Sequence, residues 1–322
     1  MKKLIYSIIL SMIRDKPLQN PVVKGAEDIR VPPLLTAQDK NIKVMTFNIK
    51  CFAKADKVAH TWSNRKQNVQ NLIDRQEADI IGLQEVKHPQ YKFFIENMAD
   101  QYGYFGTYRT GLNLASAEKI LRKKDPEPNS FYLTFASLIG EASPIFYKKS
   151  RYELLDCDMF WLSDTPAKPS ADWGATHYRV ATYVKLKDHY TNKVLHVFNT
   201  HFDNASDVAR QNSSKLINRI IEQKGLDNVI VMGDMNDVEG SSAYQKLISE
   251  TLSNSKFLMP EAERSNGPTY NGYGKMIDLP IDHIFLQQEN FNVISNRIIA
   301  DRINKDTFIS DHFPVVAILK QK

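Results

Sequence analysis

Apolar runs of strand length recur along the chain, and each one carries a residue able to bind a cation, contact a phosphate or move a proton. A short apolar run bounded by turn signals is typical of a strand buried on both faces. Polar side chains at the ends of buried strands can meet at one edge of a sheet, so the recurrence predicts a shared site. The runs and their polar residues are Ile42–Ile49 with Asn48, Asp79–Glu85 with Glu85, Val194–Asp203 with His201, Val229–Asp237 with Asp234 and Asn236, Pro280–Leu286 with Asp282, and Ile309–Leu319 with Asp311 and His312.

Other elements separate these runs. Arg179–Lys187 alternates apolar and polar residues, and Thr191-Asn192 can turn the chain into Val194–Thr200, which predicts a hairpin. Thr107–Ser137 lacks clear periodicity apart from helical character in Leu114–Lys124, and we interpret it as an excursion beside the site. Apolar spacing predicts helices over Thr61–Glu77, Phe93–Gln101, Ala205–Lys224 and Ser241–Glu250.

Bulk composition limits the class of protein only broadly. With 322 residues, of which 42% are apolar, the chain can bury a large core, and the composition argues against global disorder. The net charge of +5 is compatible with a polyanionic substrate but does not require one. Cys51 and Cys157 lack metal-ligand spacing and form no disulfide framework, so we interpret both as structural thiols.

The first 41 residues read as an apolar segment followed by a linker. Met1-Lys2-Lys3 and the apolar Leu4–Ile13 resemble the start of a secretory signal, although no small-x-small cleavage site follows. If residues 1–13 act as a signal, the protein is exported or membrane-anchored, and otherwise it is cytoplasmic. Membrane association is expected only through this segment, if it is not cleaved. The catalytic domain is predicted over residues 42–322.

The strand-end carboxylates and amides suit phosphate chemistry. Hydrolysis of a phosphate ester needs charge neutralisation, an activated water and help for the departing oxygen. Glu85 is the leading ligand for a divalent cation, with Mg²⁺ expected and Mn²⁺ as the alternative. Gly233 lets the backbone turn, so that Asp234 can orient or deprotonate water while Asn236 fixes a phosphate oxygen. Alone, an Asp-x-Asn after a strand is more often a turn, so this interpretation depends on its partners.

Two histidines extend the set. His312 can contact the phosphate or polarise the reacting centre, while Asp311 orients it or contacts the metal. His201 can form a second charged partnership, with Glu141 as its expected carboxylate. Taken singly, each histidine would more often be a structural hydrogen-bonding residue than a catalyst.

The order of the motifs is more specific than any one of them. They resemble the endonuclease/exonuclease/phosphatase superfamily, with its deoxyribonuclease-I-like fold, over roughly Ile42 to Lys320. Phe160–Pro166 and Asn199–Asp203 are similar to a bacterial group nearer the deadenylase-like exonucleases. The motifs are Thr46–Ile49, Gly82–Val86, Asn199–His201, Gly233–Asn236, Ile281–Ile284 and Ser310–His312.

This resemblance implies a four-layer α/β/β/α sandwich of two packed mixed sheets, with the site at one end. It implies a metal held by Glu85, Asn48 and Asp311, and a substrate contacted by Asn48, Arg179 and Asn236. It also implies roles in water alignment or proton transfer for His201, Asp234, Asn236, Asp282, His312 and Glu141.

We therefore expect a divalent-metal-dependent phosphoesterase, foremost a phosphodiesterase or nuclease. The enzyme alternative is a phosphomonoesterase acting on a sugar, inositol or lipid phosphate, because the same core serves both. A catalytically inactive binding module is the alternative from another class, but its signature, a lost ligand or histidine, is absent from the sequence. The expected partner is a phosphate-ester substrate, with nucleic acid among the candidates, and no obligate protein partner is indicated.

Overall fold

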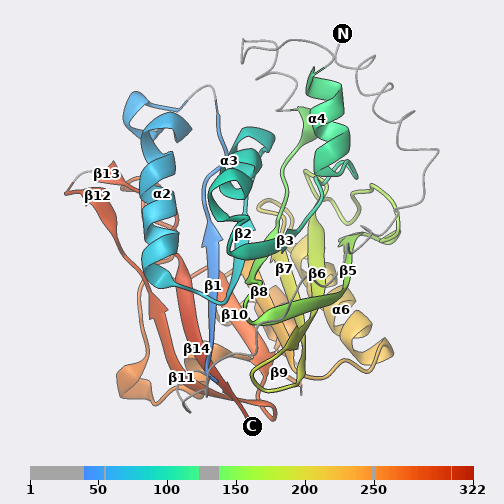
Figure 1. The fold of residues 1–322 in the computed structure, drawn as a ribbon. Coiled ribbons are helices and arrows are strands. Elements are labelled where there is room, and N and C mark those ends of the chain that lie inside the picture. Colours follow the sequence, from blue (N-terminus) through green and yellow to red (C-terminus); the bar gives the residue numbers. More distant parts are fainter. Residues whose placement is uncertain (1–39, 54–55, 123–137, 249–250, 306) are drawn as a thin grey trace.

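Two mixed six-stranded sheets form the centre of the molecule (Figure 1). The computed structural model describes residues 40–53, 56–122, 138–248, 251–305 and 307–322. The predicted N-terminal segment therefore lies almost entirely outside the described residues, as do residues 123–137 of the predicted excursion. In the described part of the chain, every helix is too short or too polar to span a membrane.

The first sheet brings three predicted motifs to one edge. In spatial order its strands are β11 (Phe291–Ile298), β14 (Val315–Gln321), β1 (Ile42–Asn48), β2 (Ile80–Gln84), β4 (Ile145–Lys148) and β3 (Tyr102–Phe105). Because β1 and β2 are parallel, Asn48 and Gln84 are neighbours at the end where both strands finish. Because β14 is antiparallel to β1, its start lies at this same end, where Val315 pairs with Thr46.

The second sheet brings the remaining motifs to the same end. In spatial order its strands are β5 (Tyr152–Trp161), β6 (Val180–Asp188), β7 (Val194–His201), β8 (Val229–Asp234), β10 (Asp282–Gln287) and β9 (Leu252–Asn254). β6 and β7 form the predicted hairpin, and β7 runs parallel to β8. A separate ribbon pairs β12 (Arg302–Asn304) with β13 (Thr307–Phe308).

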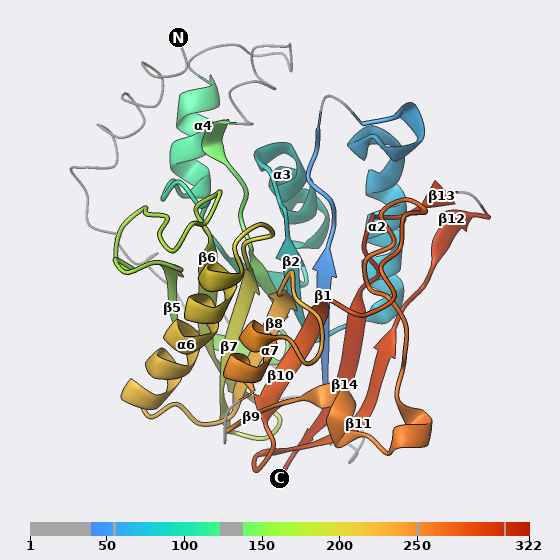
Figure 2. The same ribbon diagram turned by 180° about the vertical axis from the view of Figure 1, so that it is seen from behind.

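Helices cover the outer face of each sheet, which confirms the predicted four layers. α2 (Trp62–Gln76) and α3 (His88–Met98) pack on the first sheet (Figure 1). α6 (Asp207–Gln223) and α7 (Ser242–Leu247) pack on the second (Figure 2). α4 (Leu114–Arg122) forms where the predicted excursion shows helical character.

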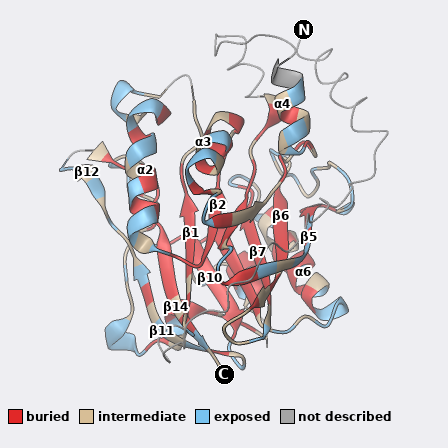
Figure 3. Cartoon of the chain, in the orientation of Figure 1, coloured by how far each residue is buried: buried red, intermediate tan, exposed pale blue. Residues whose placement is uncertain are grey.

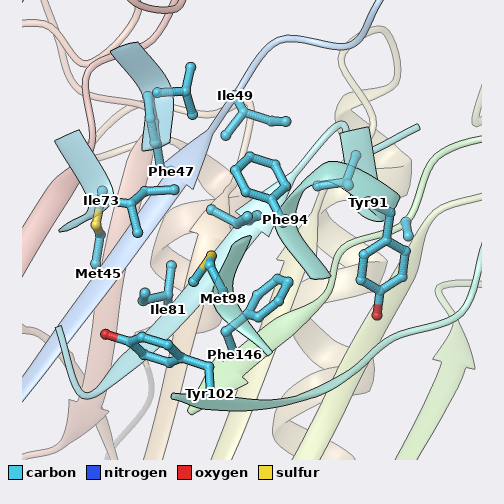
Figure 4. Close-up of a cluster of buried hydrophobic side chains, with 14 of the residues drawn as sticks. Met45, Phe47, Ile49, Ile73, Ile81, Tyr91, Phe94, Met98, Tyr102 and Phe146 are labelled. Carbon is cyan, nitrogen blue, oxygen red and sulfur yellow. The ribbon is translucent and has the colours of Figure 1, made fainter. Parts of the chain in front are cut away.

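Burial on both faces explains why the strands read as continuous apolar runs. Val44, Val197 and Ile284 belong to the core between the two sheets, and the strands are mostly buried (Figure 3). On the outer side of the first sheet, Phe94 from α3 and Phe146 from β4 pack in a second core (Figure 4). The two cores hold the strand ends, and therefore the site, on a rigid support.

A buried polar contact joins the sheets directly below the site. Asn199 on β7 donates from Nδ2 to the carbonyl of Leu83 at 2.9 Å and accepts from Gln84 Nε2 at 2.6 Å. A Cβ at Gly82 would lie 2.7 Å from Oδ1 of Asn199, so the motif needs glycine here for close approach of the sheets.

Some predicted boundaries are wrong, for local reasons. The expected strand Ile309–Leu319 begins only at Val315, because the chain bends over Ile309–Asp311 and His312 forms an isolated bridge with Tyr270. Helix α3 starts at His88 instead of Phe93, since Pro89 occupies its first turn and Gln90 Oε1 accepts the N–H of Lys87 at 3.2 Å.

Candidate active site

The strand registers place three predicted residues side by side. His201 pairs with Asp234 in the parallel β7–β8 ladder, and Asp234 pairs with Asp282 in the antiparallel β8–β10 ladder. Across the sandwich, β1 packs against β8, which brings Asn48 to Asp234. Residues from distant parts of the sequence therefore meet at one end of the sandwich.

Asp234 is the centre of this group. Its Oδ2 accepts a hydrogen bond from Asn48 Nδ2 at 2.9 Å and lies 3.5 Å from His201 Nε2 and 3.7 Å from His312 Nε2. Its Oδ1 accepts the N–H of Asn236 at 2.9 Å. Burial, together with the neighbouring charge of Asp282, raises the pKa of Asp234 to about 7.

His312 and Asp282 form a close buried pair. His312 Nδ1 lies 2.8 Å from Asp282 Oδ2, and both side chains are almost fully buried. Burial alone would lower the pKa of His312, but Asp282 and Asp234 raise it to about 10. His312 is therefore a protonated imidazolium between two carboxylates at neutral pH.

His201 has the opposite electrostatic setting. Burial and the positive charge of Arg179 hold the pKa of His201 well below its usual value, although Glu85 acts in the other direction. His201 is therefore a neutral imidazole at neutral pH, and its position near Asp234 lets it exchange hydrogen bonds with a group bound there. The two predicted histidines thus differ in charge.

Glu85 lies on the other side of Asn48. Its backbone is in the left-handed region, with φ at 62°, which is costly for a residue with a side chain. Its Oε2 accepts the N–H of Cys51 at 2.7 Å and its Oε1 accepts from Asn48 Nδ2 at 3.2 Å. Although burial would raise the pKa of Glu85, the charge of Lys50 and the hydrogen bond from the Cys51 N–H lower it, so the carboxylate is ionised.

Asp311 lies close to this position and has a lysine beside it. Nζ of Lys50 is 3.4 Å from Oδ2 of Asp311, and the Lys50 backbone is also left-handed, with φ at 60°. Burial favours a neutral amine, but Glu85 and Asp311 raise the pKa of Lys50 above its usual value. The Lys50 ammonium thus pairs with Asp311 in a region that also holds the Glu85 carboxylate, where a divalent cation would find oxygen ligands.

The donor set therefore fits a cation at Glu85 and Asp311, but not at Asn48 as predicted. Oδ1 of Asn48 accepts the N–H of Lys50 at 3.1 Å, and its Nδ2 faces Glu85 and Asp234. An amide NH₂ donates hydrogen bonds and cannot ligate a cation. In this arrangement, Asn48 joins the two carboxylates instead of binding metal.

A second arrangement of acids and imidazole suits metal binding by distance alone. Ligand atoms of Asp234, Asp282 and His312 lie within 4.8 Å of one another. His312, however, is protonated and already bonded to Asp282, whereas a metal ligand must be a neutral imidazole. We therefore interpret this group as a proton-sharing network.

Glu141 and Arg179 lie at the far side of His201. The structure does not show the predicted pairing of Glu141 with His201: Oε2 of Glu141 accepts from Nη1 of Arg109 at 3.0 Å. The carboxylate 3.5 Å from His201 is instead Asp234, because β7 and β8 are adjacent. Arg179, directly before β6, is buried at 6% exposure.

Asn236 is placed as predicted beside Asp234, but the glycine before them acts differently. Nδ2 of Asn236 donates to the carbonyl of Phe202 at 3.0 Å, and its φ is 47°. Gly233 lies within β8, and a Cβ there would collide with the carbonyl oxygen of Thr200. The glycine is thus needed for close strand packing, not for a turn.

Two site residues were not predicted. Lys50 follows a predicted strand end but looks like an ordinary surface lysine in sequence. Arg109 lies in the section without periodicity, where no pattern placed it near Glu141. The signal that could have found Arg109 is its position ahead of Gly111, which has φ at 86° and ends a tight turn.

Comparisons with known proteins identify chains of similar sequence and fold. The chain is 27% identical to the uncharacterized protein L388 of Acanthamoeba polyphaga mimivirus, over 87% of this chain and 100% of that protein. An endonuclease/exonuclease/phosphatase from Bacteroides vulgatus superposes with a TM-score of 0.73 at 28% identity, covering 88% of this chain and 99% of the other. A mannosyl-6-phosphatase from Bacteroides thetaiotaomicron superposes with a TM-score of 0.71 at 25% identity, covering 86% and 99%.

A family model gives the assignment. The model of the Endonuclease/Exonuclease/phosphatase family matches residues 45–312, a span that contains all the site residues described above. The predicted superfamily and fold are therefore confirmed, and hydrolysis of phosphate esters is the chemistry of this fold's family. The chain belongs to the Endonuclease/Exonuclease/phosphatase family.

Proposed function

We propose that this protein is a divalent-metal-dependent hydrolase that cleaves phosphate esters with an activated water. The observation that carries the proposal is the position of Asp234, whose Oδ2 lies 2.9 Å from an amide donor and within 3.7 Å of two imidazoles. A carboxylate held in this way can orient a water and accept its proton. The protonated imidazole next to it can donate to a phosphate oxygen.

Each remaining residue has a part in this proposal. Glu85 and Asp311 would hold Mg²⁺ or Mn²⁺, which would neutralise charge on the phosphate oxygens. Asp282 keeps His312 oriented and charged through the 2.8 Å contact. His201 is placed to hydrogen-bond the phosphate from the second sheet, and Asn236 lies at the edge of the same space.

The kind of ester needs a separate argument. The sequence favours a phosphodiester, and nucleic acid remains a candidate substrate. The similarity to a mannosyl-6-phosphatase, at 25% identity over 86% of this chain, favours a phosphomonoester of a small molecule such as a sugar. We adopt the monoester as the leading candidate and the diester as the second.

A substrate panel tests the proposal. Single-stranded RNA and DNA, duplex DNA, sugar phosphates, inositol phosphates and sphingomyelin are each incubated with Mg²⁺, with Mn²⁺ and with a chelator. We expect hydrolysis of at least one ester that depends on the metal. Glu85→Ala should lower turnover by at least about 100-fold, because a bound cation supplies several kcal/mol of charge stabilisation.

A binding measurement accompanies the panel. Mg²⁺ or Mn²⁺ should raise the melting temperature of the wild-type protein but not that of Glu85→Ala. Glu96→Ala is the matched control, because Glu96 is an exposed glutamate on α3 that pairs only with Lys92 at 3.6 Å among the described ion pairs. Absence of metal-dependent turnover on every ester would favour the inactive binding module and overturn the proposal.

A further inference from the structure

The site residues lie in a row, because facing strands of the two sheets contribute them in order. β14 packs against β10, β1 against β8, β2 against β7 and β4 against β6. The row therefore runs from Asp311 and His312 at one end, past Asn48 and Glu85, to the segments around β4 and β6. Two arginines occupy this second end: Arg109, which follows β3, and Arg179, which precedes β6.

Arg109 is held in place by several contacts. Its Nη1 donates to Oε2 of Glu141 at 3.0 Å, and its backbone N–H donates to the Glu141 carbonyl at 2.8 Å. Its own carbonyl accepts from Nε1 of Trp161 at 2.8 Å. Its Cγ also packs close to Gly140, since a Cβ added there would lie 3.0 Å away. The guanidinium keeps 19% side-chain exposure, so it is fixed but accessible.

Arg179 is buried and lacks one hydrogen bond. Its Nη2 donates to Oδ1 of Asn204 at 3.2 Å, but its Nε has no hydrogen-bond partner among the described residues and lies 3.6 Å from Oδ2 of Asp203. That carboxylate is already saturated by N–H groups of Ala205, Ser206 and Thr176 and by the Thr176 hydroxyl. A buried donor without an acceptor is costly, and this one faces Asp203, so Arg179 contributes its positive charge to the site end and not a free Nε donor.

We propose that Arg109 is a specificity residue that, together with Arg179, binds a terminal oxygen found in phosphomonoesters but not in phosphodiesters. The inference rests on the proposed phosphoesterase function. A monoester has three terminal oxygens and two negative charges near neutral pH, whereas a diester replaces one of these oxygens with a second ester link. In this proposal, Glu85, Asp311 and His312 face two of the terminal oxygens. Arg109 and Arg179 face the third.

Charge supports this assignment. A guanidinium forms its strongest hydrogen bonds with carboxylates and phosphates. Arg109 uses Nη1 to donate to Glu141, and a guanidinium has further N–H groups that can donate to an oxyanion. Both arginines also act on His201, where they help to keep the imidazole uncharged beside the phosphate position. A second ester group at this end would displace an anionic oxygen from two positive charges.

The test compares Arg109→Ala with wild-type protein on matched esters. Turnover is measured on p-nitrophenyl phosphate, a monoester, and on bis(p-nitrophenyl) phosphate, a diester, in the presence of Mg²⁺ or Mn²⁺. We expect kcat/KM for the monoester to fall by about 10- to 100-fold, the range for loss of one charge-assisted hydrogen bond, and that for the diester by less than about threefold. Arg75→Ala is the control, since it removes an exposed arginine that is also paired with a carboxylate, at 2.9 Å from Asp301.

A binding arm keeps the two proposals separable. Inorganic phosphate and dimethyl phosphate are titrated into the same proteins by calorimetry, without turnover. Arg109→Ala should weaken the binding of phosphate but not of dimethyl phosphate. Wild-type protein that hydrolyses no ester would contradict the proposed function. The inference about Arg109 would still hold if Arg109→Ala bound phosphate, but not dimethyl phosphate, more weakly than wild type.

Two results would overturn the inference. Equal losses on both esters would mean that Arg109 only supports the fold, and unchanged binding of inorganic phosphate would mean that it contacts no phosphate. If Arg109→Ala does not fold, as judged by circular dichroism, Glu141→Gln takes its place. This variant keeps a hydrogen-bond acceptor for Arg109 but removes the carboxylate charge that holds it. Its kcat/KM should therefore fall more for the monoester than for the diester, but by less than in Arg109→Ala.

Discussion

Both ends of the sandwich bury charged groups, but the two ends differ in how completely these groups are hydrogen-bonded. At the end opposite the site, Arg151 donates to both oxygens of Asp188, at 3.2 and 2.9 Å, and to Oδ2 of Asp79 at 3.1 Å. It also donates to the carbonyls of Lys40 and Asn41. Asp79 precedes β2, the strand that Glu85 follows, so the same strand reaches both ends.

The site end leaves some of its charged groups incompletely bonded. Oδ1 of Asp282 and Nε of Arg179 have no hydrogen-bond partner among the described residues, although both are buried. His201 and Asp234 stay 3.5 Å apart, too far for a strong hydrogen bond. Buried charged groups whose hydrogen bonds are complete stabilise the fold. Buried charged groups that lack partners cost stability and are retained where a ligand completes their hydrogen bonds.

The largest expected effect is on turnover at the site end. Asp234→Asn should lower kcat by about 1,000-fold, because the amide cannot accept a proton from water. Its free energy of unfolding, measured in urea, should be unchanged or higher, since burial and Asp282 disfavour the Asp234 charge. A kcat within tenfold of wild type would contradict the role of Asp234.

The opposite result is expected at the other end. Arg151→Met should lower the free energy of unfolding by about 3–5 kcal/mol, because two buried carboxylates lose their partner. Turnover per folded molecule should stay at the wild-type level. Arg75→Ala removes an exposed ion pair, so it should lower the free energy of unfolding by less than about 1 kcal/mol in the same urea titration. A large loss of turnover in folded Arg151→Met would erase the distinction between the two ends.

A smaller effect is expected from a histidine on the same strand as His201. His196 lies five residues earlier on β7, where its Nδ1 is 2.7 Å from the Tyr183 hydroxyl. Burial lowers the pKa of His196 to about 4. The unfolded chain therefore binds more protons than the folded one between about pH 6.5 and pH 4, so stability is lost as the pH falls through that window.

His196→Gln tests this assignment, because glutamine keeps a hydrogen-bonding group but does not titrate. Urea unfolding between pH 5 and pH 8 should give a flatter pH dependence of stability in the variant than in wild type. His312 has the opposite sign: its pKa is raised to about 10, so its contribution is present below about pH 6.5 and is lost as the pH rises through 10. Identical slopes in the variant and wild type would show that His196 does not titrate as described.

The sequence predicted most of the residues that meet at the strand ends. Asn48, Glu85, Asp234 and His312 were expected to converge, and the structure brings them together. These residues were predictable from sequence because each one lies at the end of, or close to, a buried apolar run. The period and length of such a run are local properties of the sequence. Helix α2 was readable for the same reason, since its apolar spacing covers the buried Val69 and Leu72.

Pairing between side chains was not readable in the same way. Glu141 was expected beside His201 but contacts Arg109, and Asn48 was expected as a metal ligand but joins two carboxylates. The sequence shows which polar side chains are available at the strand ends. It does not show which neighbour each side chain contacts. The network around Arg151 was missed for this reason too, because its acids lie 72 and 37 residues away.

The sequence alone determined the fold class, the family resemblance and the set of groups available for phosphate chemistry, because these depend on local patterns and their order. Tertiary structure alone decided the charge states of His201 and His312, the partner of Glu141 and the placement of Arg109 at the other end of the row from His312. Burial and neighbouring charges set those properties, and both arise only when strands distant in sequence pack side by side.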